Sequence, residues 1–342
     1  MAKTRKPKAT LVGLRSMMPL VYPEAVLKAI GERVDWIGSP ALFADPEPGE
    51  EFPEAAVDPE AEIIFSTWGM VNLDEAFLED HPNLKAVFYG AGTVRGFVGE
   101  ASWKHGIRIF SAALANAVPV AEFTVAQILL GLKQSASLRI REAAQWRASH
   151  PVKMAMRGNY RARVGLVSYG AIARLVRRNL RLFDHEVWVY DPFLTREEAD
   201  EEDIRLVSLE DLFRECLVVS LHAPLLEATR HLVRGHHLES MPANACFINT
   251  ARGAIVHEAE MAETLRNRTD LTAIIDVLEK EPPEDGNPLL QLSNAWVYPH
   301  IAGSMGQECG RMGEYMLNAC DDYLAGRAST LEVVKADMGR IA

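Results

Sequence analysis

The chain has 342 residues, 48% of them hydrophobic and 24% charged, an ordinary globular composition with room for two domains. A net charge of −11 argues against a nucleic-acid-binding protein, because such proteins usually have an excess of basic residues. No segment is expected to cross a membrane, and the basic start (residues 3–8) is interpreted as a solvated tail. The four cysteines do not have the spacing of metal ligands. We therefore expect a cytoplasmic protein with buried reduced thiols and no metal site.

The first 118 residues predict a small α/β domain. Short apolar runs alternate with two helical patterns, Pro23–Glu32 and Leu73–Glu79. The runs that predict strands are Thr10–Leu14, Val34–Ile37, Ile63–Thr67, Lys85–Tyr89 and Ile107–Ser111. This alternation indicates a mainly parallel sheet covered by helices. Residues 38–60, rich in proline and acidic residues, predict a long surface connection with little regular structure.

A long helix is predicted to begin near Pro119 and to run through VAEFTVAQILLGLKQ. It is apolar on most faces, so we expect it to be buried. From its end to about Tyr160 the chain is expected to be helical and then irregular.

Residues 164–191 read VGLVSYGAIARLVRRNLRLFDHEVWVYD and predict strand, turn, helix, strand and acid, the order of a dinucleotide-binding βαβ unit. The turn has Ser168, Gly170 and Ala173 where the fingerprint has three glycines. Gly170 would let the backbone approach a phosphate, and alanine is an accepted third residue, but Ser168 must tolerate a tight turn without being glycine. Asp191 lies 18 residues after Ala173, near the ~20 expected for an acid that binds ribose. Taken alone, the stretch is equally consistent with a packing turn.

Further apolar runs separated by helical stretches follow this unit. They are Leu217–Leu221, Ala245–Asn249, Thr272–Val277 and Trp296–Tyr298. They predict a second, doubly wound domain over residues 119–303. Residues 304–342, with a predicted helix at Gly306–Leu324, are expected to return to the first domain.

Five motifs occur in order along the chain: VPVAEF (118–123), VVSLHAPLLEATRHLV (218–233), ACFINTARG (245–253), IDVLEKEP (275–282) and VYPHIAG (297–303). Together they resemble the D-isomer-specific 2-hydroxyacid dehydrogenases over residues 60–320, most of the chain. The resemblance implies a Rossmann-type dinucleotide domain inserted into a smaller flavodoxin-like substrate domain, with the active site in the cleft.

The resemblance implies that Arg252, Glu281 and His300 are catalytic. A guanidinium fork can hold the carboxylate of a 2-oxo acid and polarise its carbonyl. Histidine can give a proton near neutral pH, and a carboxylate against its other nitrogen favours the protonated form. Each residue also has a structural interpretation: Arg252 as a cap or ion pair, Glu281 as part of a solvated charge run, and His300 as a turn residue.

The resemblance also implies a set of dinucleotide-binding residues on the phosphate turn and at strand ends. They are Ser168, Tyr169, Gly170, Ala171, Ile172, Asp191, Pro192, His222, Ala223, Pro224, Thr229, Thr250, Ala251, Asp276 and Gly303, with Arg252 and His300. Asp276 takes the position that binds the nicotinamide carboxamide, although an aspartate there is often a helix cap; His222 could equally be a packing residue. The Asp191 carboxylate can bind ribose hydroxyls but repels a 2′-phosphate, so NAD (NADH) is favoured over NADP.

Substrate contacts are expected from two loops of the first domain in addition to Arg252 and His300. One contains Trp68 and Gly69, although Trp68 could equally be a core residue. The other contains Gly92, Thr93 and Arg95, and Arg95 stands where the family has an aspartate. Arg95 could face outward and pair with an acid such as Glu100, which we favour, or bind a second anionic group of the substrate.

These observations predict an NAD-dependent dehydrogenase or reductase of a small D-2-hydroxy acid or 2-oxo acid. Glyoxylate, hydroxypyruvate or a phosphorylated hydroxy acid would suit the site. The resemblance also implies a homodimer formed through the dinucleotide domain, with residues 119–160 as the contacting arm. Two alternatives remain open: an NAD(H)-sensing binding protein, like the corepressors that share this fold, or a member whose cofactor binding is weakened by Ser168.

Overall fold

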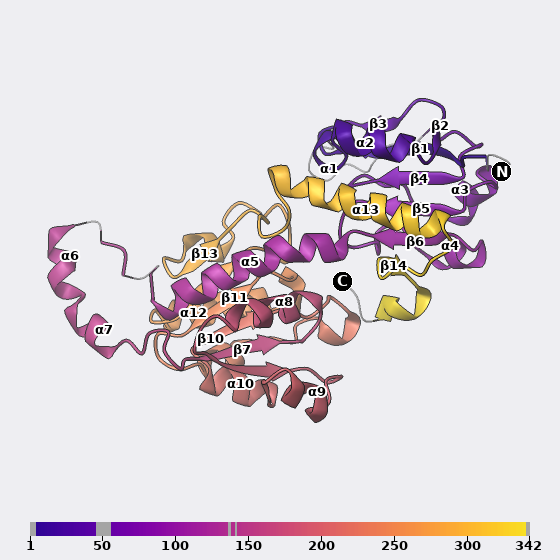
Figure 1. Ribbon diagram of the computed structural model, residues 1–342. Coiled ribbons are helices and arrows are strands. Elements are labelled where there is room, and N and C mark those ends of the chain that lie inside the picture. Colours follow the sequence, from indigo (N-terminus) through magenta and orange to yellow (C-terminus); the bar gives the residue numbers. More distant parts are fainter. Residues whose placement is uncertain (1–4, 46–55, 136–137, 141, 340–342) are drawn as a thin grey trace. The chain divides into compact units, whose positions relative to one another are not determined.

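The computed structural model describes residues 5–45, 56–135, 138–140 and 142–339 (Figure 1). The chain forms two compact units: residues 1–116 with 304–342, here called the first unit, and residues 117–303, the second unit. The division after Asn116 falls two residues before the expected boundary at 118.

The first unit is built on a sheet of short, mostly buried strands. They are β1 (Lys8–Leu14), β2 (Asp35–Trp36), β3 (Ala41–Phe43), β4 (Ile63–Ser66), β5 (Ala86–Tyr89), β6 (Arg108–Ser111) and β14 (Glu332–Val333). The order is β14-β6-β5-β4-β1-β2, and β3 also pairs with β1. All pairs are parallel except that of β14 with β6. Apart from β3 and β14, this is the 2-1-3-4-5 order of flavodoxin-like folds.

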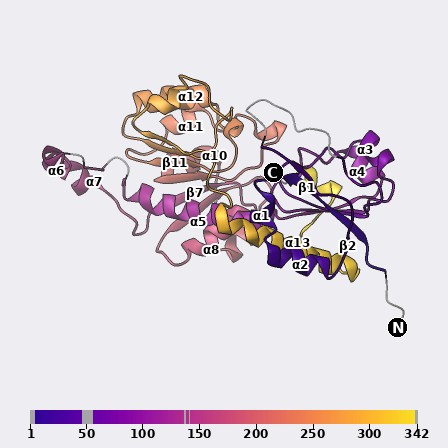
Figure 2. The same ribbon diagram turned by 90° about the horizontal axis from the view of Figure 1, so that it is seen from above.

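Helices cover both faces of this sheet (Figure 2). Helices α1 (Met18–Val21), α2 (Glu24–Gly31) and α13 (Cys309–Leu324) pack on one face, and α3 (Glu75–Asp80) and α4 (Glu100–Lys104) on the other. A Cβ atom on Gly313 would lie 1.9 Å from the Val21 carbonyl oxygen, so only glycine lets α13 approach α1 this closely. Short 3₁₀ turns, η4 (Gly306–Glu308) and η5 (Lys335–Gly339), flank α13 and β14.

The second unit contains a wholly parallel sheet. Its strands are β7 (Arg163–Val167), β8 (Glu186–Tyr190), β9 (Arg205–Leu206), β10 (Val218–Leu221), β11 (Cys246–Asn249), β12 (Thr272–Ile275) and β13 (Ala295–Val297). The order β13-β12-β11-β10-β7-β8-β9 contains the 3-2-1-4-5-6 arrangement of a Rossmann fold, with its switch point between β7 and β10. The expected doubly wound fold is confirmed.

The helices of the second unit form a layer on each face of the sheet, as Figure 2 shows. One layer packs α5 (Ala113–Leu132), α8 (Ala171–Leu180) and α9 (Arg196–Glu201) against the strands. The other packs α10 (Leu209–Glu215), α11 (Gly235–Glu239) and α12 (Glu258–Asn267). The remaining elements are α6 (Ala143–Ala148), α7 (His150–Ala155), η1 (Glu227–Thr229), η2 (Gly253–Ile255) and η3 (Pro288–Gln291).

Helix α5 corrects three expectations. It begins at Ala113, not near Pro119, and Pro119 lies inside it. Its 20 residues make it long and apolar enough to cross a membrane by length and composition, although no such segment was expected. Ala121 and Ile128 nevertheless pack into the core of the second unit, which is what a core helix does. The helix is only partly buried, since Leu114 is 40% and Leu130 47% exposed.

Three short strands were not predicted: β3, β9 and β14. Strand β3 lies in the region 38–60 that was expected to lack regular structure; residues 46–55 of that region lie outside the described part of the chain. Strand β14 follows the C-terminal helix and adds an antiparallel edge through Glu332, whose carboxylate accepts two hydrogen bonds from Arg108 of β6. The four cysteines are buried and free, as expected.

Candidate active site

The candidate residues of the second unit lie at one edge of its sheet. Because all seven strands are parallel, their carboxyl ends share that edge. Ser168, Asp191, His222, Thr250 and Asp276 each follow such a strand end closely. In doubly wound folds ligands bind at this edge, next to the switch point.

The turn between β7 and α8 can accept a phosphate group. Gly170 is the N-cap of α8 and is exposed, and a Cβ atom built on it would meet nothing within 4 Å. The amides of Ala171 and Ile172 begin the helix, where unsatisfied N–H groups and the helix dipole favour an anion. The turn therefore fits the pyrophosphate of a dinucleotide.

Ser168 has a left-handed backbone conformation, with φ of 72°. Its amide donates to the Tyr190 carbonyl oxygen at 2.7 Å, which ties the turn to the end of β8. Such a conformation costs a residue other than glycine about 1–2 kcal/mol. The tight turn expected from the fingerprint is therefore present, with a side chain where glycine is usual.

The carboxylate of Asp191 is half-buried and already accepts three hydrogen bonds. Its Oδ2 atom accepts from the Ser168 hydroxyl at 3.1 Å and from the Tyr169 amide at 2.7 Å. Its Oδ1 atom accepts from the Phe193 amide at 2.7 Å. Pro192, between them, is exposed. The acid at the end of β8 is thus fixed in orientation beside the phosphate turn.

His222, at the end of β10, is buried, and burial lowers the pKa of its imidazole to about 3. Among the described residues, neither ring nitrogen has a hydrogen-bond partner. The turn that follows is held by Thr229, whose hydroxyl donates to the Pro224 carbonyl at 2.6 Å and accepts from the Leu226 amide at 2.8 Å. His222 is therefore a neutral side chain beside Ala223, with unused hydrogen-bonding capacity.

The end of β11 is organised by Asn249, which the sequence did not single out. Its side-chain carbonyl accepts from the Ala251 amide at 3.0 Å, and its amide group donates to the Arg252 carbonyl at 3.1 Å. Thr250 is buried, and its hydroxyl lies 3.2 Å from that of Thr124 on α5. The residues before Arg252 are thereby locked in place.

Arg252 is half-buried, and burial lowers the pKa of its guanidinium although the nearby Glu281 opposes this shift. Its Nη1 atom donates to the Ala251 carbonyl at 2.6 Å. Nε and Nη2 have no hydrogen-bond partner within the described residues. Two donor nitrogens of a planar fork therefore remain for a ligand.

His300 and Glu281 form a hydrogen-bonded pair. The His300 Nδ1 atom lies 2.7 Å from the Glu281 Oε2 atom, and the other carboxylate oxygen accepts from the Leu278 amide at 2.8 Å. The hydrogen bond to Glu281 raises the pKa of His300, against the opposing effect of burial. Burial would raise the pKa of Glu281, but the bonds from His300 and Leu278 outweigh it and lower that pKa. The charge of Arg252 acts on both groups, so the three side chains form one electrostatic cluster.

Asp276 positions His300 by holding the turn that follows it. The Asp276 carboxylate, 1% exposed, accepts from the Ile301 amide at 2.8 Å and from the Ala302 amide at 3.0 Å. Its backbone carbonyl accepts from the His300 amide at 3.0 Å, and His300 has a φ of 55°. Gly303, after this turn, is half-buried. These bonds give the Asp276 carboxylate a structural role, and its predicted contact with the nicotinamide carboxamide stays a prediction.

Gly253 brings the Arg252 segment against the Glu281 segment. A Cβ atom on Gly253 would lie 1.9 Å from the Leu278 carbonyl carbon, so no larger residue fits without moving that backbone. The close approach of these two segments is what joins Arg252 to the Glu281–His300 pair.

The candidate substrate residues of the first unit occupy loops after its strands. The Trp68 carbonyl accepts from the Leu14 amide at 2.7 Å, and the Trp68 side chain is half-buried against the core; Gly69 has a φ of 86°. The Ser111 hydroxyl donates to the Gly92 carbonyl at 2.5 Å. The Thr93 hydroxyl accepts from the Arg95 amide at 3.3 Å.

Arg95 is exposed, as the favoured interpretation expected, but Glu100, the acid named as an example of its partner, is paired elsewhere. The Arg95 guanidinium donates to the Met338 carbonyl in η5, and Glu100 instead pairs with Lys335 at 2.6 Å. Strand β14 precedes η5 and brings it to this loop, and no sequence pattern indicated β14. Arg95 therefore contacts the C-terminal segment.

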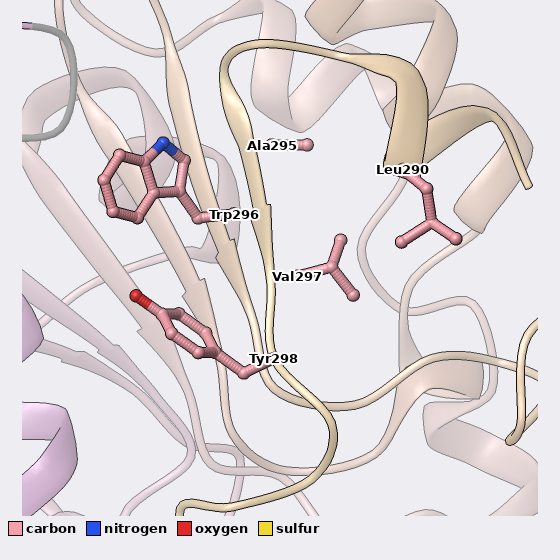
Figure 3. A pocket seen from close by; sticks show the side chains of 5 residues that line it. All are labelled: Leu290, Ala295, Trp296, Val297 and Tyr298. Atoms are coloured by element: carbon pink, nitrogen blue, oxygen red, sulfur yellow. The ribbon is translucent and has the colours of Figure 1, made fainter.

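A shallow hollow of about 340 Å³ follows the edge strand β13 and is separate from these residues. It is lined by Leu290, Ala295, Trp296, Val297 and Tyr298, none of them charged. Figure 3 shows Trp296 and Tyr298 on one side of the strand and Ala295 and Val297 on the other. None of the side chains of the site described above lines this hollow.

Comparisons with known proteins agree with this architecture. Residues 128–302 match the family model described as D-isomer specific 2-hydroxyacid dehydrogenase, NAD binding domain. The chain is 32% identical over 263 residues to (S)-sulfolactate dehydrogenase of Chromohalobacter salexigens, covering 74% of this chain and 84% of that protein. It is 31% identical over 250 residues to glyoxylate reductase of Korarchaeum cryptofilum, covering 71% of this chain and 74% of that protein.

Other relatives are longer than the region they share. Identity to D-3-phosphoglycerate dehydrogenase of Archaeoglobus fulgidus is 27% over 278 residues, and the match spans 80% of this chain but only 51% of that protein. Among solved structures, apo D-mandelate dehydrogenase of Rhodotorula graminis has the same fold, with a TM-score of 0.77 and 19% sequence identity. The match covers 96% of this chain and 98% of that chain. The family model covers half of the chain, and the sulfolactate dehydrogenase match spans both units. The chain therefore belongs to the D-isomer specific 2-hydroxyacid dehydrogenase family.

Proposed function

We propose that this protein is an NAD-dependent oxidoreductase that transfers a hydride between nicotinamide and C2 of a small D-2-hydroxy acid or 2-oxo acid. The observation that carries the proposal is the 2.7 Å bond between His300 and Glu281, within the electrostatic reach of Arg252. An imidazole with a raised pKa beside a guanidinium with two unused donors suits a substrate that needs both a proton and an anion-binding group. The NAD-binding family model adds support.

In this proposal each residue of the trio has a separate task. When bound, NADH supplies the hydride. Arg252 holds the substrate carboxylate and polarises the carbonyl beside it. Because Nδ1 of His300 is committed to Glu281, its Nε2 atom gives a proton to the carbonyl oxygen during reduction and takes it back during oxidation. Glu281 fixes the tautomer and favours the protonated imidazole.

Titration of the protein with NADH, followed by a panel of 2-oxo acids, tests the proposal. NADH fluorescence reports binding, and loss of NADH absorbance reports turnover. The panel should contain acids with and without a second anionic group, because the relatives include a glyoxylate reductase and a sulfolactate dehydrogenase. Turnover of at least one acid is expected. Binding without turnover on any acid would favour the NAD(H)-sensing alternative, and absence of binding would favour a degenerate member.

We propose NAD over NADP because of Asp191. Replacing Asp191 with alanine removes the charge that would repel a 2′-phosphate, and we expect the ratio of kcat/KM for NADPH to that for NADH to rise by about tenfold or more. Glu197→Ala, which removes an exposed acid from the following helix α9, is the matched control and should leave the ratio unchanged. An Asp191→Ala variant that discriminates as the wild type does would contradict the assignment.

We expect the pH dependence to report the His300–Glu281 pair. In Glu281→Gln the pKa of His300 should fall back toward its ordinary value, because the hydrogen bond that His300 donates to a carboxylate, which raises this pKa, is lost. Reduction needs the protonated imidazole, so kcat/KM for reduction falls as pH rises through this pKa. That fall should begin at a lower pH in the variant, and the rise of the oxidation rate should also begin at a lower pH.

The matched control for this shift is Glu279→Gln. It removes a neighbouring acid that pairs with His231 at 3.1 Å and not with His300. Its pH profiles should follow those of the wild type. Identical alkaline limbs in Glu281→Gln and wild type would contradict the proposed role of Glu281.

We also propose that the protein forms a homodimer through residues 119–160. Support comes from large apolar side chains exposed on α6 and α7, Trp146 at 66% and Met154 at 74%. Such surface is usually covered by a partner. Sedimentation velocity of the full chain tests the assembly, with a monomer as the contrary result.

A further inference from the structure

Ser168 is the one residue of the phosphate turn whose side chain contacts the ribose-binding candidate Asp191. A carboxylate offers about four acceptor positions, two on each oxygen. Oδ2 accepts from the Ser168 hydroxyl and the Tyr169 amide, so both of its positions are used. Oδ1 accepts from the Phe193 amide, which leaves one position.

A ribose that donates both hydroxyls to this carboxylate needs two acceptor positions. The amides of Tyr169 and Phe193 belong to the backbone of the two turns and can withdraw only if that backbone moves. The Ser168 hydroxyl can withdraw by rotation about a single side-chain bond. It is therefore the donor that must leave when the second ribose hydroxyl arrives.

The backbone at Ser168 provides a second, independent observation. With φ of 72°, the position favours glycine, which would provide the same turn without strain and without a hydroxyl. Asp191 would then offer two free positions to a ligand. The presence of a serine here thus changes the state of the carboxylate.

We propose that the Ser168 hydroxyl is an internal competitor for Asp191, which occupies the carboxylate in the free protein and is exchanged for a ribose hydroxyl when the cofactor binds. This inference rests on the proposed NAD-dependent function. Ser168 is a positioning residue: it holds the Asp191 carboxylate in its orientation and lowers the affinity for the dinucleotide. Cofactor binding is consequently weaker, and release faster, than with glycine at this position.

The test compares NADH dissociation constants and melting temperatures of wild type, Ser168→Ala and Ser168→Gly. Both variants should bind NADH about three- to tenfold more tightly than the wild type, the change in affinity that the net free energy of one hydrogen bond produces. Ser168→Ala should have an unchanged or lower melting temperature without ligand, since it keeps a side chain in the left-handed conformation and loses a bond. A purely structural serine would instead weaken binding when removed. Ser240→Ala, which removes a hydroxyl donating to the His237 carbonyl in the same unit, is the control and should leave affinity unchanged.

A double-mutant cycle locates the effect. In an Asp191→Ala background, Ser168→Ala should leave NADH affinity unchanged, because the hydroxyl then has no carboxylate to occupy. The inference would be overturned if Ser168→Ala and Ser168→Gly both bound NADH as tightly as the wild type or more weakly. It would also be overturned if Ser168→Ala still tightened NADH binding in the Asp191→Ala background. A wild-type protein that binds no NADH would contradict the proposed function itself, before any variant is compared.

Discussion

Replacing His300 with alanine should lower the rate of 2-oxo acid reduction by about 10²–10⁴-fold, the usual contribution of a general acid. NADH binding should be retained, because the substitution leaves the phosphate turn between β7 and α8 and Asp191 after β8 unchanged. The loss should appear mainly in kcat, since the proton is transferred in the transition state rather than on binding. Single-turnover absorbance of bound NADH measures the step directly.

A matched control exists in the first unit. His105 also pairs with a glutamate, Glu75, at 3.0 Å, but lies on the surface at the end of α4. His105→Ala should keep wild-type turnover. An active His300→Ala variant would refute the role of His300 as acid, whereas loss of NADH binding in that variant would show that the change disturbs more than the proton transfer.

Both sheets could be predicted because their central strands are largely apolar runs. Ile63–Ser66 and Val218–Leu221 are buried at every position, and such runs identify a strand covered on both faces. Strands β9 and β14 have two residues each and form only because a neighbouring strand offers its edge. No local pattern of two residues can indicate this. The start of α5 was misplaced because Pro119 favours a first helical position, while Ser111 caps the Ala113 amide six residues earlier.

In the candidate site, too, local features could be predicted and contacts between distant segments could not. Arg252, Glu281 and His300 could be proposed as candidates from short motifs, and each lies after the end of a parallel strand. The bonds that orient them could not be predicted, because they join distant segments. Asp276 holds the turn after His300, and Gly253 admits the Leu278 backbone. The bond from Ser168 to Asp191 likewise joins residues 23 positions apart.

The other large effect is expected from replacing Arg252. Arg252→Ala should lower kcat/KM for a 2-oxo acid by roughly 30- to 5,000-fold, corresponding to about 2–5 kcal/mol for removing one partner of a buried, hydrogen-bonded charge pair. Arg252→Lys should recover only part of this loss, because a lysine keeps the charge but not the planar fork. Arg266→Ala, which removes an exposed arginine at the end of α12, is the control.

The two variants separate the tasks assigned to the guanidinium. If Arg252 only held the carboxylate, the loss would fall on KM and lysine would restore much of it. Because the fork also polarises the carbonyl in the transition state, we expect kcat to fall as well, and to stay low in Arg252→Lys. The charge of Arg252 also opposes protonation of His300, so its removal should move the alkaline limb of the reduction profile to higher pH. Wild-type kcat/KM in Arg252→Ala would exclude Arg252 from the site, and the remaining pair could not then account for selection of a 2-oxo acid.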